Sequence, residues 1–263
     1  MKVGISTASL YGKLYTEQAL ELFAQNGVAC AEVFLASFSE YKEAFGRELQ
    51  RVKGDVEVYS LHTLNSQFEG QLFSRSPRQY ADALEIFTSA LRVGNMLGAA
   101  IYVMHGPAQM KYTKYVTDYA FFGQRSAELA AISQQYGMML TWENVHWAHY
   151  NHPMFMQNIR RHTGGVYLGN TLDIKQAAQS GTTVDAYIKD MDGNIQNIHV
   201  VDMDEDGNLV LPGRGCYDFK ALFQKIGEYN GAVMIEVYDG CYRETAELIE
   251  SYQWLKKQLC GSL

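Results

Sequence analysis

The sequence is poor in the features that mark secreted, disordered and membrane-spanning chains. Its cysteines are scattered and form no Cys-x-x-Cys pair, so we expect reduced thiols at all four: Cys30, Cys216, Cys241 and Cys260. Four prolines against 23 glycines, with no low-complexity stretch, argue against long linkers or disorder. No apolar run approaches the roughly 20 residues that a membrane-spanning helix needs.

The chain also lacks an excess of positive charge. Its formal net charge is −7, whereas proteins that bind polyphosphate backbones usually carry a basic face, so a nucleic-acid partner is not expected. Residues 1–6 are already strand-like, so we expect no signal peptide and a cytoplasmic location. With 263 residues, 47% of them hydrophobic, the chain can bury a large core without disulfides.

Apolar, strand-like segments alternate with helical ones along the whole chain. Strands are expected at residues 3–8, 31–36, 56–62, 99–105, 138–143, 166–173, 195–202 and 232–237. Helices are expected after them at residues 16–26, 39–53, 77–97, 117–136, 153–162, between 174 and 190, 218–229 and 243–259. Eight such pairs predict a (β/α)8 TIM barrel, a single α/β domain over residues 1–263. A doubly wound sheet needs a G-x-G-x-x-G turn after its first strand, and residues 6–12 lack it.

The third to the eighth predicted strands each carry, at or near the end, a side chain that can bind a metal: His62, His105, Glu143, Asp173, His199 and Glu236. In a barrel of this type the active site lies at the carboxyl ends of the strands, so these side chains are expected to meet. Two glutamates, one aspartate and one histidine would form an open site for a divalent metal. Taken singly, each residue also fits a capping or hydrogen-bonding role.

An ordered series of short motifs resembles the xylose isomerase-like TIM barrels over essentially the whole chain. The motifs are Ser60-Leu61-His62, Met104-His105-Gly106, Trp142-Glu143-Asn144, Leu172-Asp173, Ile198-His199-Val200-Val201-Asp202, Pro212-Gly213-Arg214-Gly215 with Asp218-Phe219, and Ile235-Glu236. This superfamily includes sugar and sugar phosphate isomerases and epimerases, and the endonuclease IV-type enzymes. The series is fairly specific to the superfamily and much less specific within it.

The resemblance implies four ligands for one divalent metal, which would be Mn²⁺, Mg²⁺, Co²⁺ or Zn²⁺: Glu143, Asp173, His199 and Glu236. It also implies that Glu143 and Glu236 are catalytic, removing and returning a proton through a metal-bound enediolate. The function expected is therefore that of an isomerase or epimerase acting on a sugar, a sugar phosphate or a polyol. An inosose-type dehydratase, an endonuclease IV-like phosphodiesterase and a non-catalytic sugar-binding relative are the alternatives. For the oligomeric state, a homo-oligomer is one alternative.

Departures from the family pattern separate these alternatives. The family often has a histidine three residues after the sixth-strand aspartate, and this chain has Gln176 there. The endonuclease branch has an Asp-x-His pair after the seventh strand that is absent from residues 202–215, so a three-metal site is incomplete. His62 and His105 match two ligands of that branch's first zinc, which leaves a second metal as an alternative, but we favour a role in lining the sugar pocket. Gln176 can still bond to a substrate hydroxyl.

Four further features carry weaker signals. Trp147, in the loop at residues 144–152, is predicted to stack on a sugar; an ordinary exposed loop is the alternative. Arg214 either binds a phosphate or carboxylate of the substrate or pairs structurally with nearby acids, and we slightly favour the pairing. The long loop at residues 63–76 is expected to be a lid or a subunit contact. Glu32 is expected to bond to neighbours inside the barrel mouth, with an assisting role in the site as the alternative.

Overall fold

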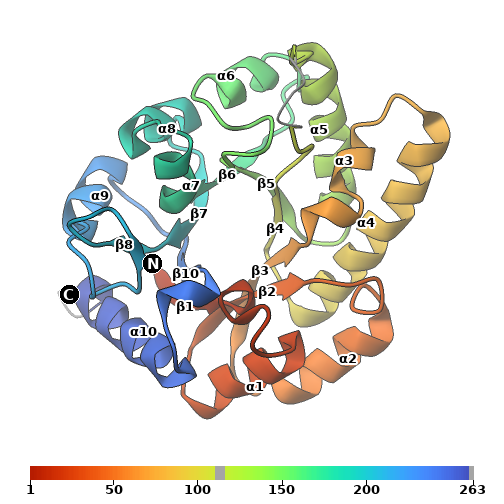
Figure 1. The fold of residues 1–263 in the computed structure, drawn as a ribbon. Helices are drawn as coiled ribbons and strands as arrows, with labels where there is room; N and C mark the ends of the chain where they lie inside the picture. The colour runs from red at the N-terminus through yellow and green to blue at the C-terminus, as the bar shows by residue number, and fades with distance from the viewer. Residues whose placement is uncertain (110–115, 261–263) are drawn as a thin grey trace.

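This computed structural model describes residues 1–109 and 116–260, and eight parallel strands close into a barrel within them (Figure 1). Around the barrel the strands lie in the order β1-β10-β7-β6-β5-β4-β3-β2. Their bounds are β1 (Lys2–Ser6), β2 (Cys30–Leu35), β3 (Glu57–Thr63), β4 (Ile101–Met104), β5 (Met139–Glu143), β6 (Gly169–Asp173), β7 (Ile195–Val200) and β10 (Ala232–Ile235). The predicted (β/α)8 barrel is confirmed.

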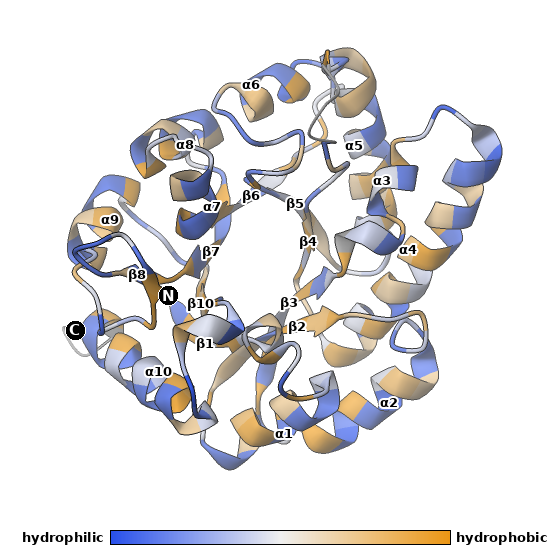
Figure 2. Cartoon of the chain, viewed as in Figure 1, coloured by the Kyte–Doolittle hydropathy of each residue, from blue (hydrophilic) through white to orange (hydrophobic). Residues whose placement is uncertain are grey.

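Helices surround the strands as an outer ring, and Figure 2 shows them banded in hydrophobic and hydrophilic residues. The helices are α1 (Thr16–Gln25), α2 (Glu43–Val52), α3 (Glu69–Leu72), α4 (Pro77–Leu97), α5 (Tyr119–Gln135), α6 (Phe155–Arg160), α7 (Ile174–Gln179), α8 (Val184–Met191), α9 (Phe219–Ile226) and α10 (Thr245–Cys260). Short 3-10 turns follow β1, β3 and β10: η1 (Thr7–Leu10), η2 (Asn65–Gln67) and η3 (Asp239–Cys241). Within the described residues, no helix is long and apolar enough to cross a bilayer.

Helix α4 illustrates why the sequence folds in this way. Pro77 suits the first helical turn, because its fixed φ is already helical and its missing N–H is not needed there. Gly98 ends the helix with a φ of +77°, a left-handed conformation that glycine adopts without a steric penalty. The side that packs on the barrel consists of residues three or four positions apart: Ala83, Phe87, Ala90, Gly94 and Leu97.

Two predicted boundaries differ because side chains bond to the backbone at those points. The helix predicted from residue 39 begins only at Glu43, since Glu40 accepts a hydrogen bond from the Ala36 N–H (2.7 Å) and holds a turn. The strand predicted to reach residue 202 ends at Val200. Asp202 instead belongs to a small hairpin, β8 (Asp202–Met203) with β9 (Leu209–Val210), and accepts hydrogen bonds from four backbone N–H groups of its loop: Met203, Gly213, Gly215 and Tyr217.

The segment expected to be a lid or a subunit contact packs onto the barrel. Phe68 and Phe73 are buried in the core. The buried Glu69 carboxylate accepts hydrogen bonds from the backbone N–H groups of His105 (3.0 Å) and Gly106 (3.2 Å). These bonds fix the turn that follows β4, so the segment forms a wall of the barrel mouth.

Candidate metal centre

The six metal-capable residues predicted at the strand ends meet at the carboxyl end of the barrel, and all six are buried. The sheet register brings them to one level. Asp173 on β6 lies directly beside His199 on β7, and Ile235, which precedes Glu236, pairs with Val200. The closed parallel sheet therefore turns six positions that are far apart in the sequence into neighbours.

Four of these residues form the group predicted to hold one metal: Glu143, Asp173, His199 and Glu236. One ligand atom from each lies within 4.8 Å of all the others. His199 Nδ1 lies 3.4 Å from both Glu143 Oε1 and Glu236 Oε2, and 3.9 Å from Asp173 Oδ2. The imidazole therefore faces all three carboxylates.

The polar atoms of this group fit a cation. Glu143 Oε2, Asp173 Oδ2 and His199 Nδ1 are buried and make no hydrogen bond among the described residues, although His105 Nε2 and Lys175 Nζ lie 3.3 and 3.1 Å from the first two. A buried polar atom without a partner costs free energy, so a protein seldom keeps three of them together. One divalent ion bound by these atoms would satisfy all three, and hard carboxylate oxygens with one imidazole suit Mn²⁺, Mg²⁺, Co²⁺ or Zn²⁺.

The charges around the group keep its two glutamates ionised. Burial raises the pKa of Glu143, but His199 and His105 outweigh this and hold the pKa below its usual range. Burial likewise raises the pKa of Glu236, and there Lys175 and His199 outweigh it. For Asp173, burial and the neighbouring carboxylates prevail over Lys175 and raise the pKa to about 7. A bound cation would draw Asp173 to its ionised form.

Beneath the group, Glu32 on β2 joins four strands. Its fully buried carboxylate accepts hydrogen bonds from one side chain each on β1 and β3 and two on β7: Ser6 (2.9 Å), Ser60 (2.7 Å), Asn197 (3.0 Å) and His199 Nε2 (3.1 Å). An Nε2–H held by Glu32 would leave Nδ1 of His199 free to bind a cation in exchange for its proton. Glu32 Oε1 also lies 3.4 Å from His62 Nδ1.

Lys175 is a site residue that the sequence reasoning missed. Its ammonium group lies 2.8 Å from Glu236 Oε2 and 3.1 Å from Asp173 Oδ2, and it is almost fully buried. Its position in the sequence could have identified it. Because α7 starts immediately after Asp173, residue 175 falls in the first turn of a helix that begins at the barrel mouth. The protein thus places one fixed positive charge against two of the four predicted ligands.

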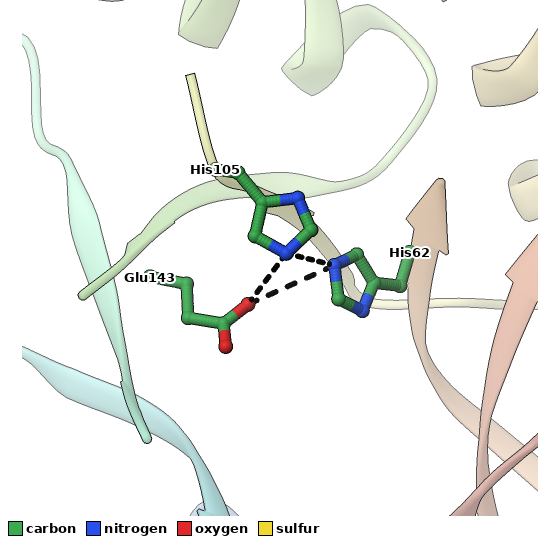
Figure 3. A group of neighbouring side chains, drawn as sticks. All are labelled: His62, His105 and Glu143. Carbon is green, nitrogen blue, oxygen red and sulfur yellow. Dashed lines mark hydrogen bonds and ion pairs between the residues drawn. The ribbon is translucent and has the colours of Figure 1, made fainter. Parts of the chain in front are cut away.

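A second group shares Glu143 and adds the two pocket histidines (Figure 3). The Nε2 atoms of His62 and His105 lie 2.9 Å apart. Glu143 Oε2 lies 3.3 Å from His105 Nε2 and 3.7 Å from His62 Nε2. The three side chains point toward one another, so they can share a proton or hold an ion between them.

A cavity of about 460 Å³ opens above both groups. Of the residues predicted to contact substrate, four line it: His62, His105, Trp147 and Gln176. The Trp147 ring lies 5.1 Å from the His105 ring, and Gln176 Oε1 accepts a hydrogen bond from the His146 backbone N–H (3.2 Å). Arg214 is not among the described residues that line the cavity. It pairs with Glu247 and Glu250 of α10, which is the structural alternative for this arginine.

The fold recurs in solved structures of low sequence identity. A D-tagatose 3-epimerase-like protein is 20% identical with a TM-score of 0.79, over 98% of this chain and 97% of its own. D-Psicose 3-epimerase, determined in the presence of D-fructose, is 16% identical with a TM-score of 0.77 over 100% of both chains. The IOLI protein with a bound zinc atom is 18% identical with a TM-score of 0.77, over 98% of this chain and 97% of its own.

No curated protein matches the sequence significantly. A family model described as the xylose isomerase-like TIM barrel does match, and it spans residues 20–258. Because the match covers most of the chain, the protein belongs to the xylose isomerase-like TIM barrel family.

Proposed function

We propose that the protein is a divalent-metal-dependent isomerase or epimerase of a sugar, a sugar phosphate or a polyol. One observation carries the proposal: Glu143, Asp173, His199 and Glu236 gather their ligand atoms within 4.8 Å at the base of an open cavity. The names of two solved relatives, a D-tagatose 3-epimerase-like protein and D-psicose 3-epimerase, support the sugar class.

The chemistry divides among the residues of the group. A bound divalent ion polarises a substrate carbonyl and so acidifies the neighbouring C–H. Glu143 and Glu236 line the cavity and are ionised, which suits one to take a proton from that carbon and the other to return it. Lys175 lies 2.8 Å from Glu236 Oε2 and favours the ionised form of Glu236. His62 lies 3.7 Å from both Glu143 Oε2 and Glu236 Oε1, where it can orient a substrate hydroxyl.

The test is proton exchange in D₂O, measured by NMR over a panel of ketoses, aldoses and inososes with Mn²⁺, Mg²⁺, Co²⁺ or Zn²⁺ added. Glu143→Gln and Glu236→Gln should each lower turnover about 100- to 10,000-fold, the range that a proton-transferring group contributes. Glu48→Gln, on the exposed side of α2, is the matched control and should turn over normally. Wild-type activity in both site variants would contradict the assignment.

The group of His62, His105 and Glu143 favours a second candidate, a site with two metals and hydrolytic chemistry. Metal analysis of the purified protein separates the two. One ion per chain supports the isomerase or epimerase, and two ions with cleavage of abasic DNA would favour the endonuclease-like alternative. Loss of water from an inosose in the same NMR panel would identify a dehydratase, which begins with the same proton abstraction.

A further inference from the structure

The cavity above the metal centre has two chemically different zones. Its base carries the histidines and carboxylates described above. The rest of its lining is mostly apolar and includes Ala8, Ser66 and Ala108. The six larger residues of this part are called the apolar rim: Tyr11, Phe34, Leu64, Trp147, Val237 and Tyr238. The C–H face of a sugar can stack on one of these rings, as predicted for Trp147, but a wall of this kind offers few partners to the sugar hydroxyls.

The aromatic members of the rim stand on opposite sides of the mouth. Tyr11 follows β1 and Phe34 lies on β2. Their rings meet edge to face, with centroids 5.7 Å apart. Trp147 follows β5, which lies across the barrel from β1 in the strand order. Phe34 also packs edge to face on His62, at 5.4 Å, so the rim is continuous with the polar base. A flat apolar group held between these walls would contact rings on both sides.

The cavity is larger than a single sugar requires. A hexose has about twelve non-hydrogen atoms, whereas pockets of about 300–1,000 Å³ bind drug-sized ligands, which are larger than a hexose. The cavity measures about 460 Å³. Space for a substituent therefore remains beside the rim after a sugar has reached the base.

Charge does not favour a phosphate as that substituent. Among the described residues that line the cavity, Lys175 is the lysine or arginine present, and Asp173 and Glu236 already hold its ammonium group. Tyr238 covers the same ammonium with its ring, at 4.9 Å from the centroid. Arg214 lies outside the cavity, paired with α10. The carboxylates of the cavity would repel a phosphate, whereas they would not repel an uncharged substituent.

We propose that the natural substrate is a carbonyl-bearing sugar or cyclic polyol that carries an uncharged aromatic substituent, and that the apolar rim binds this substituent. The inference rests on the proposed function, because it takes the polar base as the place where the sugar ring binds. It assigns Tyr11, Phe34 and Trp147 a role in specificity and none in proton transfer.

The experiment compares phenyl and methyl glycosides of glucose, galactose and mannose, titrated into the metal-loaded protein and followed by saturation-transfer NMR and calorimetry. At least one phenyl glycoside should bind about 10- to 100-fold more tightly than its methyl counterpart, since the rim buries most of one ring. Tyr11→Ala should remove much of that difference and leave the methyl glycoside unaffected. Tyr11 is 55% exposed, so truncating its side chain should not unfold the protein.

Tyr15→Ala is the matched control, because Tyr15 is 71% exposed and is not among the residues lining the cavity. It should keep the full preference for phenyl glycosides. Equal affinity for every phenyl and methyl pair, or tighter binding of the hexose 6-phosphates, would overturn the proposal. Binding is measured without turnover, so an inactive protein that prefers phenyl glycosides would refute the proposed reaction and leave the apolar subsite standing.

Discussion

Replacing Glu32 by glutamine removes one negative charge from beneath the metal centre and changes little in size. The glutamine must place an NH₂ group where one carboxylate oxygen stood. On the Oε2 side it would face the amide of Asn197 and His199 Nε2, now 3.0 and 3.1 Å away. On the Oε1 side it would face His62 Nδ1 at 3.4 Å, and His199 would keep only a neutral acceptor. In either orientation one histidine loses the partner that fixes its proton.

The magnitude follows from these two effects. A carboxylate behind a metal-binding histidine raises its basicity, and losing such a partner typically weakens metal binding about 10- to 100-fold, or about 1.4–2.8 kcal/mol. The unfolding free energy should fall by about 1–3 kcal/mol as well, because a buried donor is left without an acceptor. A protein of this size tolerates that loss, so the variant should fold and its metal affinity should be measurable.

The assay is calorimetric titration of Mn²⁺ and Zn²⁺ into metal-free protein, with ¹⁵N NMR of the histidine rings to report which nitrogen carries the proton. Asp190→Asn is the matched control. Asp190 is also buried and accepts from the N–H groups of Met156 (3.3 Å) and Gln157 (3.2 Å), but it does not line the cavity. The control should lose stability and keep its metal affinity. A folded Glu32→Gln protein with wild-type affinity and unchanged histidine spectra would refute the reasoning.

Two further predictions concern the positive charges of the site. Burial lowers the pKa of His62, but the neighbouring Glu32 carboxylate outweighs this and raises the pKa from 6.5 to about 9. Because the pKa is higher in the folded protein than in the unfolded one, protonated His62 stabilises the fold. This stabilisation is present in full below pH 6.5 and is lost as the pH rises through about 9. The metal-free protein should therefore melt at progressively lower temperature between these pH values, and His62→Gln should flatten the profile; an equal slope in both proteins would contradict this. Lys175→Met removes an ammonium group 2.8 Å from Glu236 Oε2 that would repel a metal cation and compete with it for the carboxylate. Since the interaction between two nearby unit charges is worth a few kcal/mol at an effective dielectric constant of about 20, the variant should bind metal at least about tenfold more tightly. Unchanged or weaker binding by calorimetry would exclude competition between Lys175 and the metal.

The barrel and the meeting of the six strand-end residues were predictable because both follow from periodicity. Parallel strands buried on both faces read as continuous apolar runs, and a closed barrel brings all their carboxyl ends to one mouth. Glu143 and His199 are therefore neighbours whatever the loops do. The extent of one domain over residues 1–263 and the cytoplasmic location stay predictions.

The remaining features depend on side-chain direction in loops and short helices, which periodicity does not encode. From the sequence, Lys175 would be expected on the exposed side of a helix. It points inward because α7 begins immediately after Asp173, at the barrel mouth. Glu32 lies in the middle of an apolar strand, where nothing local shows its partners on β1, β3 and β7. Residues 63–76 are long and polar like a lid, and the bonds that pack them are made by Glu69 to a turn more than 30 positions away.

The partners of Glu32 also bear on how the chain folds. Its hydrogen bonds to Asn197 and His199 span 165 and 167 positions. A nascent chain that ends just after β4 carries Glu32, His62 and His105, but it still lacks four residues of the centre: Glu143, Asp173, His199 and Glu236. The centre is therefore completed only when the last strands close the barrel, and such long-range contacts form late in folding. A metal ion would therefore bind only the complete barrel, and its binding would stabilise the folded full-length chain against unfolding.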